Sequence, residues 1–329
     1  MIKPNKKKRT SARSSDKAVD PITTRDQKGN RAGLIITVIV VAVMAAVLGI
    51  GYFQYYVAPF RRTVITVDDT AIRMDYFLKR ASLSGAAPLS MLQALTNEQI
   101  IKLEAPQYGI VVTPEDIDRE MRSLASGDNG TISEGEFREW YRQKLNETRL
   151  TDREYREITN INLLARGLQG HLAERIPTVA EQVHLYGILL PSYEDAEKTR
   201  ARWEAGEEFA DLARELSVDR TTKENGGEMG WLPRGIFRFD HIVFNLSPGE
   251  VSTPIPSQSA PSDDEPYYLF MVTEKAAARE IDEDSLQQMK LMVLDTWLPG
   301  AIQLHSVSYN FNSETDAWIK WQLSKMASK

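Results

Sequence analysis

Side chains that commonly carry out chemistry are sparse in this sequence. None of the 329 residues is cysteine, which excludes disulfides, thiolate metal sites and a cysteine nucleophile. The four histidines lie far apart in the chain, without the spacing that zinc ligands show. We therefore expect no metal and no other cofactor. The histidines are His171, His184, His241 and His305.

The stretch KENGGEMGWLPRG (223–235) has the glycine content of a loop that approaches a ligand closely. A P-loop would continue with Lys-Ser/Thr, and a dinucleotide site would place the glycines between a strand and a helix. Neither pattern is present, so this is not a phosphate site. We expect a turn in which Gly226, Gly227 and Gly230 adopt positive φ and allow close backbone approach.

A second stretch, GDNGTISEGEF (127–137), resembles the latter half of a calcium loop, with Gly130 at the turn and Glu136 as a ligand. The first and third ligand positions would fall on Ala125 and Gly127, which carry no carboxylate. A site without these ligands lacks much of its coordination. The sequence favours a plain loop between helices.

One segment predicts a membrane span. Residues 32–60 contain no charged residue, and the apolar core at 34–53 can cross about 30 Å of hydrocarbon at about 1.5 Å per residue. Residues 1–31 hold ten Lys/Arg and three Asp/Glu, which predicts a cytoplasmic N-terminus. A cleaved signal peptide would have a shorter apolar region. We expect a basic cytoplasmic tail at 1–31, a single-pass cell-membrane anchor at 32–57, and an extracytoplasmic bulk.

The chain beyond the tail is acidic. Outside residues 1–31, 30 Lys/Arg stand against 43 Asp/Glu. Nucleic-acid binding requires a basic surface. We therefore expect no nucleic-acid partner.

The body of the chain predicts an α+β fold. Alternating residues at 63–73, centred on Asp-Asp, are typical of a hairpin, and strands are expected at 181–191 and 267–275. Thr113-Pro114 and a Thr151–Glu154 capping box mark two helix starts. Helices are expected at 91–110, 113–125, 134–147, 151–176, 192–217 with a break near Gly206, 281–298 and 313–327.

Residues 181–275 resemble the parvulin family of peptidyl-prolyl cis-trans isomerases. The most specific motifs are GEEFADLARELS and LSPGEVSTPI, joined by GGEMGW (226–231) and the closing strand YYLFMV (267–272). The helical segment 63–178, with QYGIVVTPEDIDREM, resembles the chaperone region of SurA/PrsA-type extracytoplasmic foldases. Together the resemblances imply a helical chaperone-like domain at 62–179, completed by 280–329, and an inserted parvulin-like domain at 180–278 with a small antiparallel sheet flanked by helices.

Prolyl isomerisation rotates an amide over a barrier of about 18–20 kcal/mol and breaks no bond to a side chain. An enzyme for it needs an apolar pocket for the proline ring and polar groups that favour the twisted amide. The resemblance implies substrate-binding roles for Met229, Phe237 and Phe239, and catalytic roles for Asp219, Ser257 and Tyr268.

Two positions depart from the family's pattern. The first strand of the family carries His-Ile-Leu, where this sequence has Gly187-Ile188-Leu189, and the last strand carries a histidine where this sequence has Tyr268. Both histidines of the polar network are replaced. His184 lies an odd number of residues from Gly187, so it faces the other side of a strand. Tyr268 can still donate a hydrogen bond.

We expect an extracytoplasmic folding factor that binds unfolded or newly translocated polypeptides and catalyses cis-trans isomerisation of X-Pro bonds. The replaced histidines leave an alternative open: a catalytically weak or inactive parvulin-fold chaperone that acts mainly through its helical domain. A scaffolding membrane protein is a third class. The N-terminal helix would contact the membrane, and the sequence leaves a homodimer open.

Overall fold

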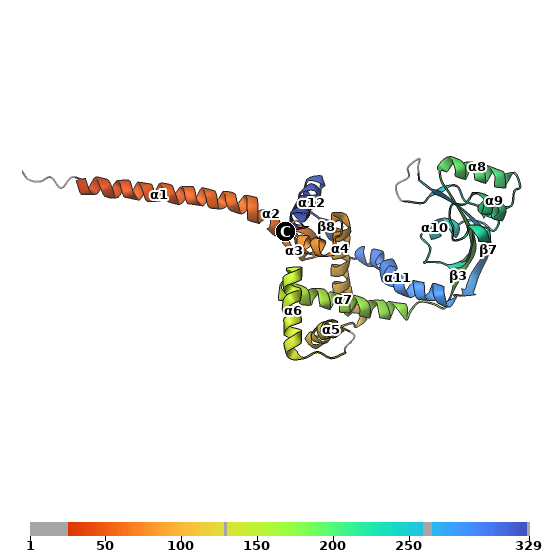
Figure 1. The fold of residues 1–329 in the computed structure, drawn as a ribbon, viewed down its shortest axis with the longest axis horizontal. Coiled ribbons are helices and arrows are strands. Elements are labelled where there is room, and N and C mark those ends of the chain that lie inside the picture. Colours follow the sequence, from red (N-terminus) through yellow and green to blue (C-terminus); the bar gives the residue numbers. More distant parts are fainter. Residues whose placement is uncertain (1–25, 128–129, 259–264, 328–329) are drawn as a thin grey trace, which may run out of the picture. The chain divides into compact units, whose positions relative to one another are not determined.

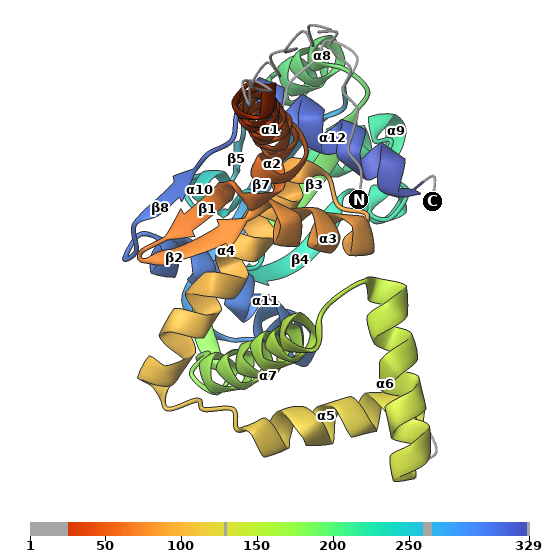
Figure 2. The ribbon, with the colours of Figure 1, turned by 90° about the vertical axis from the view of Figure 1, so that its left-hand side faces the viewer.

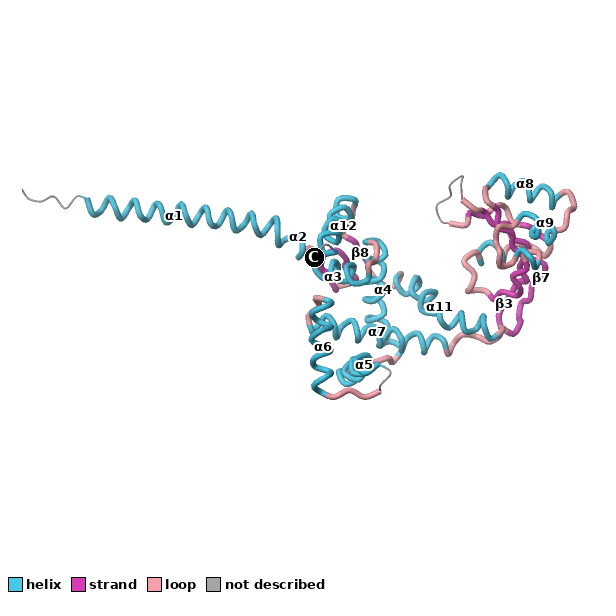
Figure 3. Tube along the Cα trace, in the orientation of Figure 1, coloured by secondary structure: helices cyan, strands magenta, loops and turns pink. Residues whose placement is uncertain are grey.

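The computed structural model describes residues 26–127, 130–258 and 265–327. The chain divides after Arg62 into two units, residues 1–62 and 63–329. The first is helical, and the second combines helices with two antiparallel sheets (Figures 1 and 3). The expected α+β class is confirmed. Most of the basic tail (1–25) and the centre of the calcium-like stretch (128–129) lie outside the described residues.

The first unit contains the expected apolar helix. It comprises α1 (Asp26–Tyr52), a π-helical turn (Phe53–Val57) and α2 (Ala58–Arg61). By length and composition, Leu34–Arg61 is a helix that could cross a membrane, and its hydrophobic window is exposed throughout. Tyr52 and Tyr56 stack at 5.2 Å near its C-terminal end.

A three-stranded sheet begins the second unit. The expected hairpin is formed by β1 (Thr63–Val67) and β2 (Thr70–Arg73), and β8 (Val307–Tyr309) pairs with the other edge of β1 (Figure 2). β1 is the central strand, and its Val64, Ile65 and Val67 are fully buried. β2 is left as an exposed edge.

Helices pack around this sheet. Thr113 and Thr151 both form the expected type of start, because each closes a capping box with the acid three residues later. After residue 280 the chain returns to these helices: α11 packs on α7 and α12 on α3. The helices are α3 (Met74–Ser84), α4 (Pro88–Glu104), α5 (Pro114–Ser126), α6 (Glu134–Thr148), α7 (Asp152–Ala173), α11 (Glu283–Ile302) and α12 (Ser313–Ala327).

The second sheet has the order β4-β3-β7-β5, and β6 also pairs with β7. Its long central pair, β3 (Val179–Leu190) and β7 (Tyr267–Glu280), places Gly187 opposite Phe270 and Leu189 opposite Tyr268. The short strands are β4 (Glu228–Pro233), β5 (Glu250–Val251) and β6 (Ile255–Pro256).

Successive side chains of this sheet alternate between two cores. Ile188, Leu190 and Leu269 pack with α8 (Tyr193–Glu204) and α9 (Phe209–Leu216). Leu185, Phe270 and Val272 pack on the other side with α10 (Asp240–Val243). Gly206, at φ 103°, separates α8 from α9, so the expected break near this residue is confirmed.

The glycine-rich stretch is only partly a turn, which corrects the expectation. Gly226 and Gly227 form the turn, whereas Met229 and Gly230 lie on β4, which pairs with β3. The expected positive φ values are confirmed at 70°, 82° and 80° for Gly226, Gly227 and Gly230. A Cβ on Gly227 would lie 2.5 Å from the carbonyl oxygen of Gly187, so this close approach requires glycine.

Candidate functional site

A cavity of about 110 Å³ opens on one side of the second sheet. It is larger than the roughly 10–15 Å³ needed by a water molecule, and near the ~150 Å³ of an apolar cavity that holds benzene. A five-membered proline ring is smaller than benzene. The lining residues are Gly187, Leu189, Asp219, Thr222, Met229, Phe237, Arg238, Phe239, Tyr268 and Phe270.

Four aromatic rings form the apolar wall. Tyr268 stacks on Phe270 at 5.1 Å with an interplanar angle of 13°. Phe239 lies 5.7 Å from Tyr268 and 5.4 Å from Phe270, and Phe237 packs against Phe270 at 5.3 Å. Such offset and tilted contacts stabilise the wall beyond the area that they bury.

The loop that carries two of these rings is closed by Asp240. Its carboxylate accepts a hydrogen bond from the backbone N–H of Gly235, and its own N–H donates to the carbonyl of Phe237 at 3.0 Å. Burial raises the pKa of the Asp240 carboxyl, although the hydrogen bond from Gly235 opposes this. These contacts hold Phe237 and Phe239 toward the cavity.

Asp219 lines the cavity as a hydrogen-bonded carboxylate. Its oxygens accept from the backbone N–H of Thr221 at 3.0 Å and from the hydroxyl of Thr222 at 2.7 Å. Burial works to raise the pKa of Asp219, but these hydrogen bonds outweigh it and hold the pKa below its usual value. Asp219 is therefore ionised at neutral pH and holds the start of the glycine turn in place.

At Gly187, the space that the histidine of the family's first strand would occupy is filled by other side chains. A Cβ on Gly187 would lie 3.1 Å from Sδ of Met229 and 3.2 Å from the ring of Phe270. Phe270 is fully buried. Met229 and Phe270 thus occupy the space beside Gly187, and the cavity has an apolar wall there instead of an imidazole.

His184 lies outside the cavity, as the strand offset predicts. Its Nδ1 contacts the hydroxyl of Thr273 at 2.9 Å, and its Nε2 contacts the carboxylate of Glu228 at 3.1 Å. Its ring packs against Tyr186 and Trp231. His184 cannot replace the missing family histidines.

The structure brings together five of the six residues expected at the site, and leaves one aside. Asp219, Met229, Phe237, Phe239 and Tyr268 all line the cavity, whereas Ser257 is not among its described lining residues. The backbone carbonyl of Ser257 instead accepts a hydrogen bond from Arg238.

Sequence reasoning missed several residues of the lining. Arg238 lies between two expected phenylalanines, and Thr222 follows Asp219 closely, so their proximity in sequence could have indicated both. Phe270 could have been found because it lies two residues from Tyr268, on the same face of the strand. Among the described residues, no group of three or more His, Asp or Glu side chains could hold a metal ion.

Residues 191–260 match the family described as rotamase, PPIC-type PPIase domain. The chain carries a PPIC-type domain. The matched segment begins after β3 and ends before β7, so it excludes both positions at which the family histidines are replaced, Gly187 and Tyr268. The recognition of a parvulin-type module is confirmed.

Relatives of the PPIC-type chain include foldases and chaperones. The foldase protein PrsA of Caldanaerobacter subterraneus subsp. tengcongensis is 28% identical over 172 residues, covering 51% of this chain and 53% of that protein. The chaperone SurA of Ralstonia nicotianae is 29% identical over 202 residues, covering 52% of this chain and 39% of that protein. The chain thus spans about half the length of such relatives, or less.

Solved structures that resemble this chain include the crystal structure of the peptidylprolyl isomerase PrsA from Bacillus cereus. That chain is 16% identical to this one, the match covers 82% of this chain and 93% of that chain, and the TM-score is 0.35.

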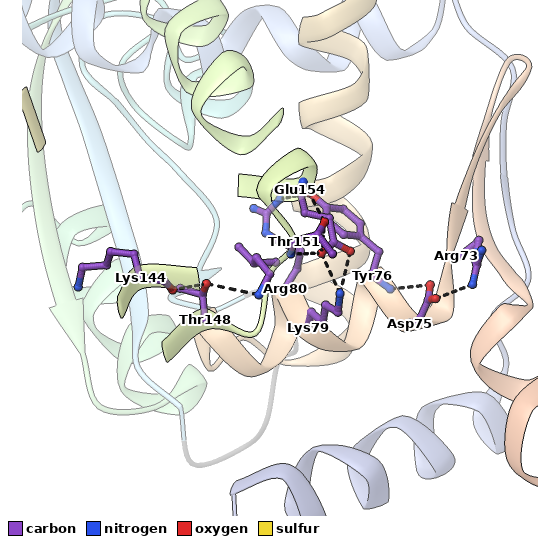
Figure 4. Close-up of polar contacts among 10 residues, drawn as sticks. Arg73, Asp75, Tyr76, Lys79, Arg80, Lys144, Thr148, Thr151 and Glu154 are labelled. Atoms are coloured by element: carbon purple, nitrogen blue, oxygen red, sulfur yellow. Dashed lines mark hydrogen bonds and ion pairs between the residues drawn. The ribbon is translucent and has the colours of Figure 1, made fainter. Parts of the chain in front are cut away.

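A second hollow, of about 460 Å³, lies among the helices beyond the PPIC-type domain. All four residues of the edge strand β2 line it, together with residues of α3, α4 and α7. Ion pairs hold its walls. Lys79 contacts both carboxylate oxygens of Glu154 at 2.8–2.9 Å, while Glu154 also accepts from the N–H of Thr151 (Figure 4).

Burial works to raise the pKa of Glu154, but the hydrogen bonds from Lys79 and Thr151 outweigh it and lower that pKa. The same carboxylate therefore caps α7 and ties it to α3. The Glu154 carboxylate at the wall of the second hollow is therefore ionised at neutral pH.

Proposed function

We propose that this protein is a membrane-anchored, extracytoplasmic folding factor whose PPIC-type domain binds proline residues of unfolded or newly translocated polypeptides and catalyses X-Pro isomerisation. The observation that carries the proposal is the cavity, in which four aromatic rings, Met229 and Asp219 converge. The names of the relatives, foldase and chaperone, support the same function.

The proposed catalysis needs no covalent step. Amide resonance keeps the X-Pro bond planar, and rotation removes that resonance and leaves a lone pair on the proline nitrogen. A donor that reaches this nitrogen binds the twisted amide more strongly than the planar one, which lowers the barrier. We assign this donor role to the hydroxyl of Tyr268, and the ring-binding role to Met229, Phe237 and Phe239.

The remaining expected residues have supporting roles in this proposal. Asp219 positions the hydroxyl of Thr222 at the cavity wall, because that hydroxyl donates to it at 2.7 Å. Ser257 acts through its backbone carbonyl, which holds Arg238. Neither residue is required to bind the proline ring.

The proposed domain division follows the expectation from the sequence. A basic cytoplasmic tail (1–31) and an anchor (32–57) precede a helical chaperone-like domain (62–179, completed by 280–329) and the parvulin-like domain (180–278). Support comes from β8, which pairs with β1, and from α11, which packs on α7. We assign polypeptide binding by the helical domain to the hollow beside β2, where an edge strand and charged walls are exposed. A homodimer remains part of this proposal.

A second candidate function is favoured by the filled space beside Gly187. Met229 and Phe270 leave no room there for an imidazole, so the polar network has lost one donor position. In this version the PPIC-type domain holds proline segments but isomerises them slowly, and the helical domain carries the chaperone function.

An isomerisation assay separates the two candidates. The full chain in detergent micelles is added to proline tetrapeptides, and cis-trans exchange is followed by NMR. We expect acceleration that falls in Phe237→Ala and persists in Val218→Ala, a control because Val218 is exposed beside Asp219 and outside the cavity lining. If the folded protein does not accelerate cis-trans exchange, the catalytic proposal is wrong and the chaperone function remains as the second candidate.

A further inference from the structure

The C-terminal helix α12 exposes a tryptophan. Of the six tryptophans, all of which lie within the described residues, Trp321 alone is more than half exposed, at 51%. Ile319, on the other side of the helix, is fully buried, and α12 packs on α3. A single exposed apolar residue is ordinary on a protein surface, so the neighbours of Trp321 decide whether this face has a role.

Trp318, Trp321 and Lys325 form a stripe along α12. Spacings of three and four residues bring side chains to the same side of a helix. The Lys325 ammonium lies over the Trp321 ring, 3.4 Å from its centroid. Tryptophan prefers the interface between membrane and water, and lysine can lie along an apolar surface while its ammonium reaches a charged headgroup. The stripe therefore combines two side-chain types that suit a lipid surface with anionic headgroups.

The start of α12 is tied to the first residues after the apolar helix. Asn310, three residues before α12, donates its backbone N–H to the carbonyl of Val64 at 2.9 Å, and its side-chain amide donates to the carbonyl of Thr63 at 3.2 Å. Thr63 is two residues after Arg61, the last residue of the helix that could cross a membrane. Two residues span at most about 7 Å and three at most about 11 Å. Chain length alone therefore keeps the first turn of α12 within about 25 Å of the end of that helix.

Charge restricts which part of the surface can meet anionic lipid. Outside residues 1–31, 30 Lys/Arg stand against 43 Asp/Glu, so anionic headgroups repel most of the folded chain. On α12 the acids Glu314 and Asp316 lie in the first turn, and Lys325 lies in the last turn. Attraction is therefore strongest toward the C-terminal end of the stripe, where Lys325 covers Trp321.

We propose that the stripe of Trp318, Trp321 and Lys325 binds the surface of the membrane that holds the apolar helix, and that its ligand is the headgroup layer of anionic lipids. This inference rests on the proposed function, because it assumes that residues 32–57 are a membrane anchor. It adds a second, peripheral attachment to the membrane. Such a contact limits the swivelling of residues 63–329 about the anchor.

The test places a fluorophore beside the stripe. Because the chain has no cysteine, one introduced cysteine carries the only label. Ser324→Cys, exposed next to Lys325, is labelled with the fluorophore NBD in the full chain, which is reconstituted into vesicles of phosphatidylglycerol and phosphatidylcholine. Ser123→Cys, exposed on α5, is the matched control, and Ala45→Cys in the apolar helix reports insertion of the anchor. Lipids with a nitroxide in the headgroup quench a label at the membrane surface, and lipids with a nitroxide in the acyl chain quench a label inside it.

We expect headgroup nitroxides to quench the label at Ser324 but not the label at Ser123. Lys325→Gln should lower the ratio of bound to unbound stripe by about fivefold, the effect of one lysine near an anionic surface. Trp321→Ala, or vesicles without phosphatidylglycerol, should also weaken the quenching. Leu291→Ala removes another exposed apolar side chain, on α11, and should have no effect.

Four results would contradict the inference. A Ser324 label quenched no more than the Ser123 label, with the Ala45 label quenched, overturns the inference and leaves the anchor intact. Quenching at Ser324 that is unchanged by Trp321→Ala and by lipid charge overturns it too, because closeness to the anchor then explains the signal. A Ser324 label with blue-shifted emission but no quenching shows that protein, not lipid, covers the stripe. A lack of quenching at Ala45 by acyl-chain nitroxides refutes the membrane anchor of the proposed function, and the inference with it.

Discussion

Replacing Gly187 with histidine, the residue that the parvulin family has at this position, is expected to destabilise the PPIC-type domain. A Cβ at this position would lie 3.1 Å from Sδ of Met229 and 3.2–3.3 Å from two ring atoms of Phe270. Optimal carbon contacts lie at about 3.5–4.0 Å, so even the first atom of the new side chain is too close. The imidazole needs additional room beyond it.

The two neighbours differ in how far they can move. Phe270 is fully buried and contacts the rings of Phe237, Phe239 and Tyr268, so it is held in place. Met229 is half-buried and flexible. Overpacking of this kind costs about 1–3 kcal/mol. We expect Gly187→His to destabilise by that amount, and Met229→Ala to relieve part of the cost in the double variant.

A double-mutant cycle measures this relief. Hydrogen exchange of the β3 and β7 amides in the full chain reports local stability without assuming that the whole chain unfolds in one step. We expect Gly187→His and Met229→Ala to be coupled favourably by about 0.5–3 kcal/mol. Gly135→His is the control, because a Cβ there meets no atom within 4 Å. Strictly additive effects, or a Gly187→His variant as stable as the parent, would refute the account of the filled space.

Two further variants test individual side chains. Tyr268→Phe keeps the ring that stacks on Phe270 but removes the hydroxyl proposed as hydrogen-bond donor. The rate of catalysed cis-trans exchange should therefore fall by about three- to tenfold, while thermal stability stays unchanged. An unchanged rate would exclude the Tyr268 hydroxyl as the catalytic donor. His305 contacts Asp68 at 2.7 Å and Glu104 at 3.0 Å, and the bond to Asp68 raises the pKa of His305. The contribution of this contact to the stability of the fold is therefore complete below about pH 6.5, and it is lost as pH rises through the pKa of His305 in the folded state. Unfolding midpoints measured from pH 5.5 to 8.5 should fall with pH in the parent and less steeply in His305→Gln; equal slopes would exclude this contact as the cause.

The same contact has a lower pH limit. The hydrogen bond from His305 lowers the pKa of Asp68, so the contribution of this carboxylate is present above its unfolded value of about 3.9 and is lost as pH falls through the lower folded value. The contact among Asp68, Glu104 and His305 is therefore strongest in the weakly acidic range between these limits.

Features that are encoded locally could be predicted from the sequence. Thr113 and Thr151 mark helix starts because each capping box lies within four residues. The positive φ values of Gly226 and Gly227 could be predicted because glycine, which has no Cβ, adopts them readily in a turn. The strand β8 could not be predicted in this way, since Val307–Tyr309 becomes a strand by pairing with β1, more than 230 residues earlier in the chain. Likewise, Met229 and Gly230 form a strand only because β3 lies beside them.

The candidate site shows the same limit. The sequence showed that Gly187 replaces a histidine, but only packing reveals that Met229 and Phe270 fill the space. Ser257 matches the family by position, yet its backbone carbonyl is the group that contacts Arg238. The contacts of Arg238 with Phe239 and Ser257 depend on how two loops meet, and no short motif encodes them.

The central claim is that the cavity holds a proline ring, and the methyl group of Met229 reports on it directly. The full chain, labelled with ¹³C at methionine methyl groups, is titrated with Ala-Glu-Pro-Phe and followed by NMR. Because Met229 lines the cavity beside Phe270, its resonance is expected to shift with peptide concentration, while the buried Met121 of α5 does not respond. A Met229 resonance that stays unchanged while the peptide binds would contradict the account.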